Sequence, residues 1–294
     1  MPPELDEEGR AKALKRLLYE RFKISLSGEW FRAHSLRALT TRAWSDLHGG
    51  QDHERLEWLG DAVCRFYGAR FLAQALPTER RSRVLEGYLQ RLTTGDFQRE
   101  VATNLQLEKL ALVPADYTPV MRADKLETKK VLMGNVFEAL VAAVFLQSHD
   151  ATEKMLYRLF RSELRKLDRQ GRPFSDVKEV GFSPESPAEW LGYYTLQLFV
   201  TRTLYEEERL KLYRAHVARH ACVRADRMSV LAETLGLRQP KDTDVRAARR
   251  LLSMMGTDQT LGDCSFAVED VLHISTEEFD RFCRPHMATN SGRW

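Results

Sequence analysis

The feature that most constrains the fold is a predicted helix with three acidic residues on one face. Within residues 53–63, Glu54, Glu57 and Asp61 recur at i, i+3 and i+7, whereas Leu56 and Leu59 fall on the opposite, apolar side. Like charges one turn apart destabilise an isolated helix by about 0.2–0.5 kcal/mol per pair. We therefore expect a cation or a basic partner beside this face.

A second segment, residues 132–146, is apolar apart from one amide and one acid. Asn135 and Glu138 are three positions apart and therefore share a helix face. Two such helices can direct their oxygen-bearing side chains to a common point. Because Mg²⁺ prefers oxygen ligands and paired metal ions can drive phosphodiester cleavage, this arrangement predicts a divalent-cation site.

These two segments resemble the signature of the ribonuclease III family, present here as Glu-Arg-Leu-Glu-Trp-Leu-Gly-Asp at residues 54–61 and Glu-Ala-Leu-Val at residues 138–141. The resemblance implies an all-α endonuclease domain that dimerises and cuts double-stranded RNA with Mg²⁺ or Mn²⁺. It assigns catalysis and metal binding to Glu57, Asp61 and Glu138, and it places Asn135 where the family has a further catalytic acid. Gly60 falls where the family packs its signature helix closely against a neighbouring helix.

The amide of Asn135 leaves two hypotheses open for this site. A neutral ligand in place of a carboxylate removes one negative charge from a place that holds divalent cations. At low effective dielectric this loss is worth roughly several kcal/mol before relaxation. Either the site is catalytically impaired, or Asn135 serves as a neutral ligand of a single working site.

The second half of the chain repeats parts of this pattern. Residues 57–60 return as residues 189–192, residues 101–107 resemble residues 231–237, and residues 133–135 resemble residues 261–263. The three separations, 132, 130 and 128 residues, are nearly constant and occur in one order, which indicates an internal duplication. In this second copy the position of Asp61 holds Tyr193 and that of Glu138 holds Phe266, so we expect no metal pair there.

The predicted organisation is an all-α chain of two ribonuclease III-like domains arranged as a pseudodimer. We expect a first domain with a partly retained acidic site, a linker, and a degenerate second domain at residues 9–167, 168–187 and 188–290. At 294 residues and 43% hydrophobic content, the chain can supply two cores. Because the family pairs two domains through their signature helices, we expect an intramolecular pair, with pairing to another ribonuclease III-like chain as the alternative.

Apolar periodicity predicts the helices of the first domain. They cover residues 9–22, the acidic motif to about Leu76, and residues 101–112, with a polar stretch from the first helix to Gln51. Pro187 suits the first turn of the signature helix in the second copy.

Three lysines precede the second motif and are candidates for RNA binding, namely Lys125, Lys129 and Lys130. They can meet phosphate groups, or they can simply be solvated. The net charge of the chain is only +3, so any strong affinity for phosphate must come from a local basic face or from partner proteins.

The composition also bounds the compartment. The longest uninterrupted apolar run, residues 139–146, is well short of the ~20 residues of a bilayer span, so we expect no membrane partner. Four cysteines without a closely spaced pair fit reduced thiols inside a cell or organelle. We expect the mitochondrial matrix if a presequence has been removed, and otherwise the cytoplasm or nucleus.

The family includes degenerate members in mitochondrial ribosomes, their assembly intermediates and RNA-editing complexes, which hold RNA or proteins without cutting. This chain looks similar to them, and we predict a pseudoenzyme that binds RNA or protein in a ribonucleoprotein of the ribosome, ribosome assembly or RNA processing. One alternative is a Mg²⁺-dependent endonuclease for double-stranded RNA with a single site in the first domain. Another is a helical scaffold whose acids pair with arginines such as Arg55 and Arg91.

Overall fold

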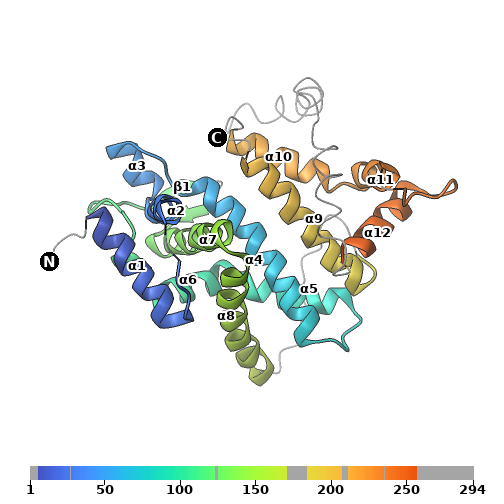
Figure 1. Cartoon of the computed structure of the whole chain (residues 1–294), viewed down its shortest axis with the longest axis horizontal. Coiled ribbons are helices and arrows are strands. Elements are labelled where there is room, and N and C mark those ends of the chain that lie inside the picture. Colours follow the sequence, from blue (N-terminus) through green and yellow to red (C-terminus); the bar gives the residue numbers. More distant parts are fainter. Residues whose placement is uncertain are drawn as a thin grey trace. The chain divides into compact units, whose positions relative to one another are not determined.

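The protein is built from helices, with a single small hairpin in the part that the structure describes (Figure 1). This structure is a computed structural model, and it describes residues 6–26, 28–122, 125–170, 184–206, 211–234 and 236–256. The predicted all-α class is confirmed.

The chain divides into two compact units. Unit 1 comprises residues up to Phe71 together with Tyr88–Pro173, and unit 2 comprises Leu72–Gly87 together with residues from Phe174 onward. Two helices of the first half therefore contribute to both units. Most of the predicted linker and the end of the predicted second domain, residues 171–183 and 257–290, lie outside the described residues.

Unit 1 contains most of the helices. Its elements are α1 (Glu7–Phe22), α2 (Glu29–Leu39), α3 (Arg42–His48), α4 (Glu54–Ala75) as far as Phe71, α5 (Ser82–Leu92) from Tyr88, α6 (Gly95–Asn104), the 3₁₀ turn η1 (Leu107–Lys109), the antiparallel strands β1 (Val120–Arg122) and β2 (Lys125–Glu127), α7 (Lys129–Gln147) and α8 (His149–Gln170).

Helix α7 forms the centre of unit 1, with α2 and α6 packed against it. Every residue from position 132 to 145 is buried except Asn135. By length and composition alone α7 is apolar enough to cross a membrane, but 72% of its most apolar window is buried inside the protein. Its apolar character is therefore accounted for by its place in the core.

Two short helices occupy the stretch that the sequence analysis treated as polar. In α2, Phe31, Ser35, Ala38 and Leu39 are buried, at the i, i+4, i+7 and i+8 spacing of a helix face. The predicted helix over residues 101–112 is also wrong in part. Helix α6 ends at Asn104, and Gln106 adopts φ 56°, a left-handed conformation that cannot continue a helix.

Unit 2 contains α9 (Pro187–Glu206), α10 (Leu212–Cys222), α11 (Ala225–Thr234) and α12 (Asp244–Met255). Pro187 begins α9, as predicted. Helix α12 packs against both α9 and α11. From the Leu72–Gly87 segment of this unit, the buried carboxylate of Glu86 accepts hydrogen bonds from Trp190 Nε1 at 2.9 Å and Tyr194 Oη at 2.7 Å.

Candidate active site

A close contact between two helices brings the predicted acids of unit 1 together. A Cβ atom on Gly60 of α4 would lie 2.0 Å from the carbonyl oxygen of Glu138 in α7, so no larger residue fits without a shift of the backbone. The close approach expected at Gly60 is therefore present. It places Glu57 and Asp61, which flank Gly60 on α4, beside Glu138.

The three acids differ in exposure. The side chains of Glu57 and Asp61 are 29% and 25% exposed, whereas Glu138 is 8% exposed. Burial raises the pKa of Glu138 well above its usual range, and the negative charges of Asp61 and Glu57 raise it further. The structure thus brings together Glu57, Asp61 and Glu138, as the sequence predicted. The repulsion among their negative charges favours the protonated form of Glu138.

Asn135 lies on α7 one turn before Glu138 and is partly exposed. The spacing puts its amide on the face that carries Glu138. Among the described residues, no group of three or more His, Cys, Asp or Glu is arranged to hold a metal ion. The metal-binding roles of Glu57, Asp61 and Glu138 therefore stay a prediction.

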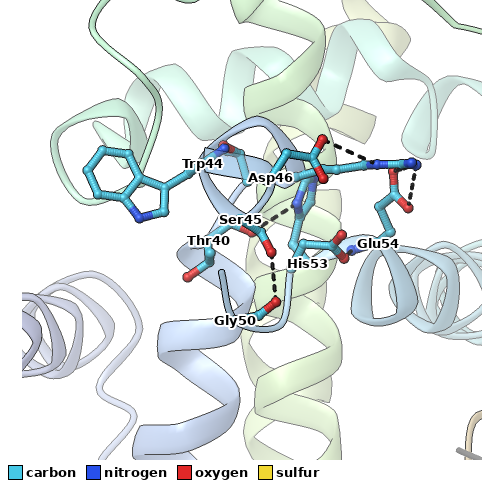
Figure 2. A network of polar contacts seen from close by, with 10 residues as sticks. Thr40, Trp44, Ser45, Asp46, Gly50, His53 and Glu54 are labelled. Atoms are coloured by element: carbon cyan, nitrogen blue, oxygen red, sulfur yellow. Dashed lines mark hydrogen bonds and ion pairs between the residues drawn. The ribbon is translucent and has the colours of Figure 1, made fainter. Parts of the chain in front are cut away.

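Arginine side chains contact Glu54 and Asp61 on the acidic face of α4, which also carries Glu57. Arg65 Nε donates to Asp61 Oδ1 at 2.8 Å from the next turn of the same helix. Arg42 of α3 lies 3.1 Å from Glu54 and 3.8 Å from Asp46, in the network of Figure 2. The predicted positive charge beside this acidic face is thus supplied, at least in part, by the protein.

His53 lies at the start of α4 and is 1% exposed. Its Nδ1 is 3.1 Å from the carbonyl oxygen of Thr40, toward which the ring points in Figure 2, and its Nε2 is 3.7 Å from Glu57 Oε2. Because a carbonyl oxygen only accepts, Nδ1 carries the proton and Nε2 faces the carboxylate. His53 is therefore a buried neighbour of Glu57 that the acidic motif alone did not identify.

Gln98 of α6 is a second residue that the sequence analysis missed. It is buried, and its Nε2 donates to Glu138 Oε1. This hydrogen bond favours the charged form of Glu138 and partly opposes the rise in its pKa. No local signal marks Gln98, because it is distant in sequence from both acidic motifs.

Two of the three candidate RNA-binding lysines lie at the start of α7. Lys129 and Lys130 are exposed in its first turn, which follows the N-cap Thr128, and Lys125 is on β2. The first turn of a helix has a positive dipole end and disfavours cations. An anion such as a phosphate would relieve this repulsion, so the proposed contact with RNA keeps a physical basis.

Residues 54–149 match the model of the family described as "Ribonuclease III domain". This region is therefore similar to a ribonuclease III domain. Curated proteins named Ribonuclease 3 are similar to the chain: from Aquifex aeolicus, 31% identical over 162 residues, 52% of this chain and 65% of the relative; from Buchnera aphidicola, 28% over 142 residues, 46% and 56%; and from Francisella tularensis, 26% over 163 residues, 54% and 66%. The chain therefore spans between 56% and 66% of the length of these relatives.

The ribonuclease III domain has a geometric counterpart in unit 2. A Cβ atom on Gly192 of α9 would lie 1.8 Å from the carbonyl oxygen of Leu252 in α12. Leu252 therefore faces Gly192 as Glu138 faces Gly60. Alignment of the two halves of the sequence predicted Phe266 at this position, and Phe266 lies outside the described residues. The correction arises because fewer residues connect α11 to α12 than connect α6 to α7.

The residue of unit 2 at the position of Asn135 is then Arg249, three positions before Leu252. Its Nη2 lies 2.7 Å from Glu185 Oε1, and its Nε lies 4.0 Å from Glu189, the repeat of Glu57. In unit 2, an apolar leucine therefore lies opposite the closely packed glycine, and an arginine faces Glu189.

Proposed function

We propose that the ribonuclease III domain of this protein is catalytically impaired and that the protein is an RNA-binding component of a ribonucleoprotein. The proposal rests chiefly on one observation, the pairing of Arg65 with Asp61 in a site whose fourth position is already the neutral Asn135. Ribosomes, their assembly intermediates and RNA-processing complexes are the settings that we propose.

The residues of unit 1 fit a divalent cation. Glu57, Asp61, Glu138 and the amide oxygen of Asn135 are all hard oxygen donors, which Mg²⁺ and Mn²⁺ accept. The raised pKa of Glu138 reflects negative charge that a cation would compensate. When bound, such an ion would polarise the phosphodiester and lower the pKa of a water molecule.

Two features weaken the affinity for that cation. Asn135 removes one negative charge, and the guanidinium of Arg65 places a positive charge on one oxygen of Asp61. A unit charge about 4 Å from an ion is worth about 4 kcal/mol at an effective dielectric of about 20. Either feature can therefore lower the occupancy of the ion by orders of magnitude.

Unit 2 supports a degenerate second copy. Helices α5 and α10 both have 11 residues, and α6 and α11 both have 10, in the same order along the chain. Together with the Gly60 and Gly192 contacts, these lengths support a tandem pair of ribonuclease III-like folds. We further propose that the pair forms within one chain, as a pseudodimer.

One observation favours a second candidate function, that of an active endonuclease for double-stranded RNA with one site. Glu57, Asp61 and Glu138 are all present and brought together, and Gln98 supports Glu138 with a hydrogen bond. In that case Asn135 would be a neutral ligand, and the acids would be sufficient for metal binding.

Metal binding and cleavage, measured on the same variants, separate these functions. We expect wild type to bind an RNA duplex without cutting it in Mg²⁺ or Mn²⁺. We expect Asn135→Asp and Arg65→Ala each to tighten Mn²⁺ binding, followed by electron paramagnetic resonance, by at least about tenfold, or about 1.4 kcal/mol. Asn104→Asp, the same change at the exposed end of α6, is the matched control and should have no effect.

Cleavage by wild type that is lost in Glu138→Ala would instead support the active enzyme. Failure of wild type to bind duplex RNA would contradict both functions.

A further inference from the structure

Helix α8 of unit 1 carries a straight row of exposed cations. Lys154, Arg158, Arg161 and Arg165 are all exposed and follow one another at i, i+4, i+7 and i+11. At 3.6 residues per turn, these positions fall within an arc of about 60°. The side chains that pack into unit 1 come from the opposite face, and they are Met155, Leu156, Phe160 and Leu164. We call the four cations the α8 stripe.

Among the side chains that the structure describes, few acids are placed to balance the charge of the α8 stripe. Glu153 of the same helix lies 3.6 Å from Arg70, and Glu163 lies 3.0 Å from Lys166. Asp150, in the first turn, is exposed and lies one turn before Lys154. Within the described part of the chain, no acid lies within ion-pair distance of the three arginines of the stripe.

Helix α1 shows the usual alternative for exposed cations. Lys12 pairs with Glu8 and Arg16 with Glu20, each one turn away at 2.7 Å. In α8 the positions one turn apart along the stripe carry like charges, which destabilise a helix by a few tenths of a kcal/mol per pair. A polyanion bound along the stripe would reverse this repulsion.

The α8 stripe continues to an exposed aromatic ring. Lys154 Nζ donates to the carbonyl oxygen of Lys23, which follows the end of α1, at 3.3 Å. Lys23 Nζ in turn lies 5.2 Å from the centre of the Tyr19 ring, which belongs to a residue 57% exposed. Basic groups beside an exposed aromatic ring are typical of nucleic-acid surfaces, where phosphates and bases are both contacted.

We propose that the α8 stripe binds the phosphate backbone of double-stranded RNA. This rests on the proposed function, which supplies RNA as the ligand. The stripe extends over about 16 Å, at about 1.5 Å per residue, and is long enough to meet several phosphates of one strand. Arginine is suited to this contact because its planar guanidinium binds phosphate with two parallel hydrogen bonds. A regular line of charge fits a repeating polyanion better than it fits an acidic protein surface.

The test is the affinity of the full-length protein for an end-labelled RNA duplex, followed by fluorescence anisotropy over a series of KCl concentrations without divalent metal. We expect Arg158→Gln/Arg161→Gln/Arg165→Gln to bind at least about tenfold more weakly. We also expect the slope of log affinity against log salt to fall by about 2 to 3, since each lost phosphate contact removes about 0.9.

The matched control is Lys12→Gln/Arg16→Gln/Arg202→Gln. It removes the same net charge from exposed cations that already pair with a glutamate of their own helix, and it should change the affinity little. Arginine-to-lysine changes at the three α8 positions should restore most of the affinity. Circular dichroism should show that each variant stays folded, because all the changed side chains are exposed.

The outcomes separate this inference from the proposed function. If wild type binds duplex RNA and the triple α8 variant binds equally well, the α8 stripe is not the RNA contact. If wild type fails to bind RNA, the proposed function itself is wrong. If polyglutamate binds as tightly as RNA and loses as much affinity in the variant, an acidic protein replaces RNA as the ligand.

Discussion

Two helix crossings, α4 with α7 in unit 1 and α9 with α12 in unit 2, have similar backbone contacts but differ in the side chains beside them. In each, a glycine lies against the carbonyl oxygen of a residue in the facing helix. In unit 1 that residue is the acid Glu138, and in unit 2 it is the apolar Leu252. The close approach of the two helices therefore does not require an acidic residue opposite the glycine.

The comparison extends to the residue that supports Glu138. Helices α6 and α11 correspond position by position, so the counterpart of Gln98 is Met228, which is also buried. A buried carboxylate needs a hydrogen-bond donor, and a buried leucine does not. Gln98 accompanies the acid Glu138 in unit 1, and the apolar Met228 accompanies Leu252 in unit 2, as expected if Gln98 serves the buried carboxylate.

The largest effect should come from the two glycines. Gly60→Ala and Gly192→Ala each force a Cβ atom to within 2.0 Å and 1.8 Å of a backbone oxygen, and we expect each to cost about 3 kcal/mol or more of unfolding free energy. Urea unfolding with hydrogen exchange resolved by helix should show the loss in α4 and α7 for Gly60 and in α9 and α12 for Gly192.

Gly95→Ala is the matched control for these substitutions. Its Cβ would lie 3.2 Å from the movable end of the Arg99 side chain, and it should be nearly neutral. Equal stability of Gly60→Ala and Gly95→Ala would show that the helix crossing is looser than described.

A smaller effect should come from the Gln98 and Glu138 pair. Gln98→Met removes the donor to the buried carboxylate and should cost about 2 kcal/mol, whereas Gln98→Met/Glu138→Leu recreates the pair found in unit 2 and should recover most of that loss. A double-mutant cycle by chemical denaturation measures the coupling. Additive effects would mean that Gln98 does not support Glu138.

The pH dependence of unit 1 should show a modest effect of known sign. The folded pKa of Glu138 is raised above 4.5, so the folded state binds its proton more tightly than the unfolded state does. Without metal, this contribution to stability is complete below about pH 4.5 and is lost as the pH rises through the folded pKa. Unfolding of wild type and Glu138→Gln from pH 4 to pH 8 measures it.

The substitution Glu138→Gln removes the titrating group, so the stability of this variant should fall less with rising pH than that of wild type. A parallel decline in the two proteins would assign the pH dependence to another residue.

Sequence reasoning succeeded where the signal was local. Helix α4 follows from apolar periodicity and α7 from a nearly continuous apolar run, and the meeting of their acids follows from the resemblance of their motifs to one family. The stripe Glu54, Glu57 and Asp61 implied a cation, and Arg65 was detectable from its position one turn after Asp61. In α2 the periodicity was also present, but its apolar positions are interrupted by the buried Ser35 and by exposed charged residues.

Sequence reasoning failed where the information lies in three dimensions. Matching letters placed the counterpart of Glu138 at Phe266, whereas the Gly192 contact identifies Leu252. Gln98 reaches Glu138 only because α6 packs on α7. No periodic pattern in the sequence predicts that contact between the two helices. His53 was visible within the motif, but its role depends on the Thr40 carbonyl of another element.

The partial exposure of Asn135 has an evolutionary consequence. It is the exception in a stretch of α7 whose other residues are all buried, so an exchange of amide for acid there leaves the core unchanged. Packing therefore constrains Gly60 and its neighbours, whereas an exchange at Asn135 acts on the charge of the site. A lineage can lose or regain charge at this position by a single substitution, while the surrounding scaffold is inherited intact.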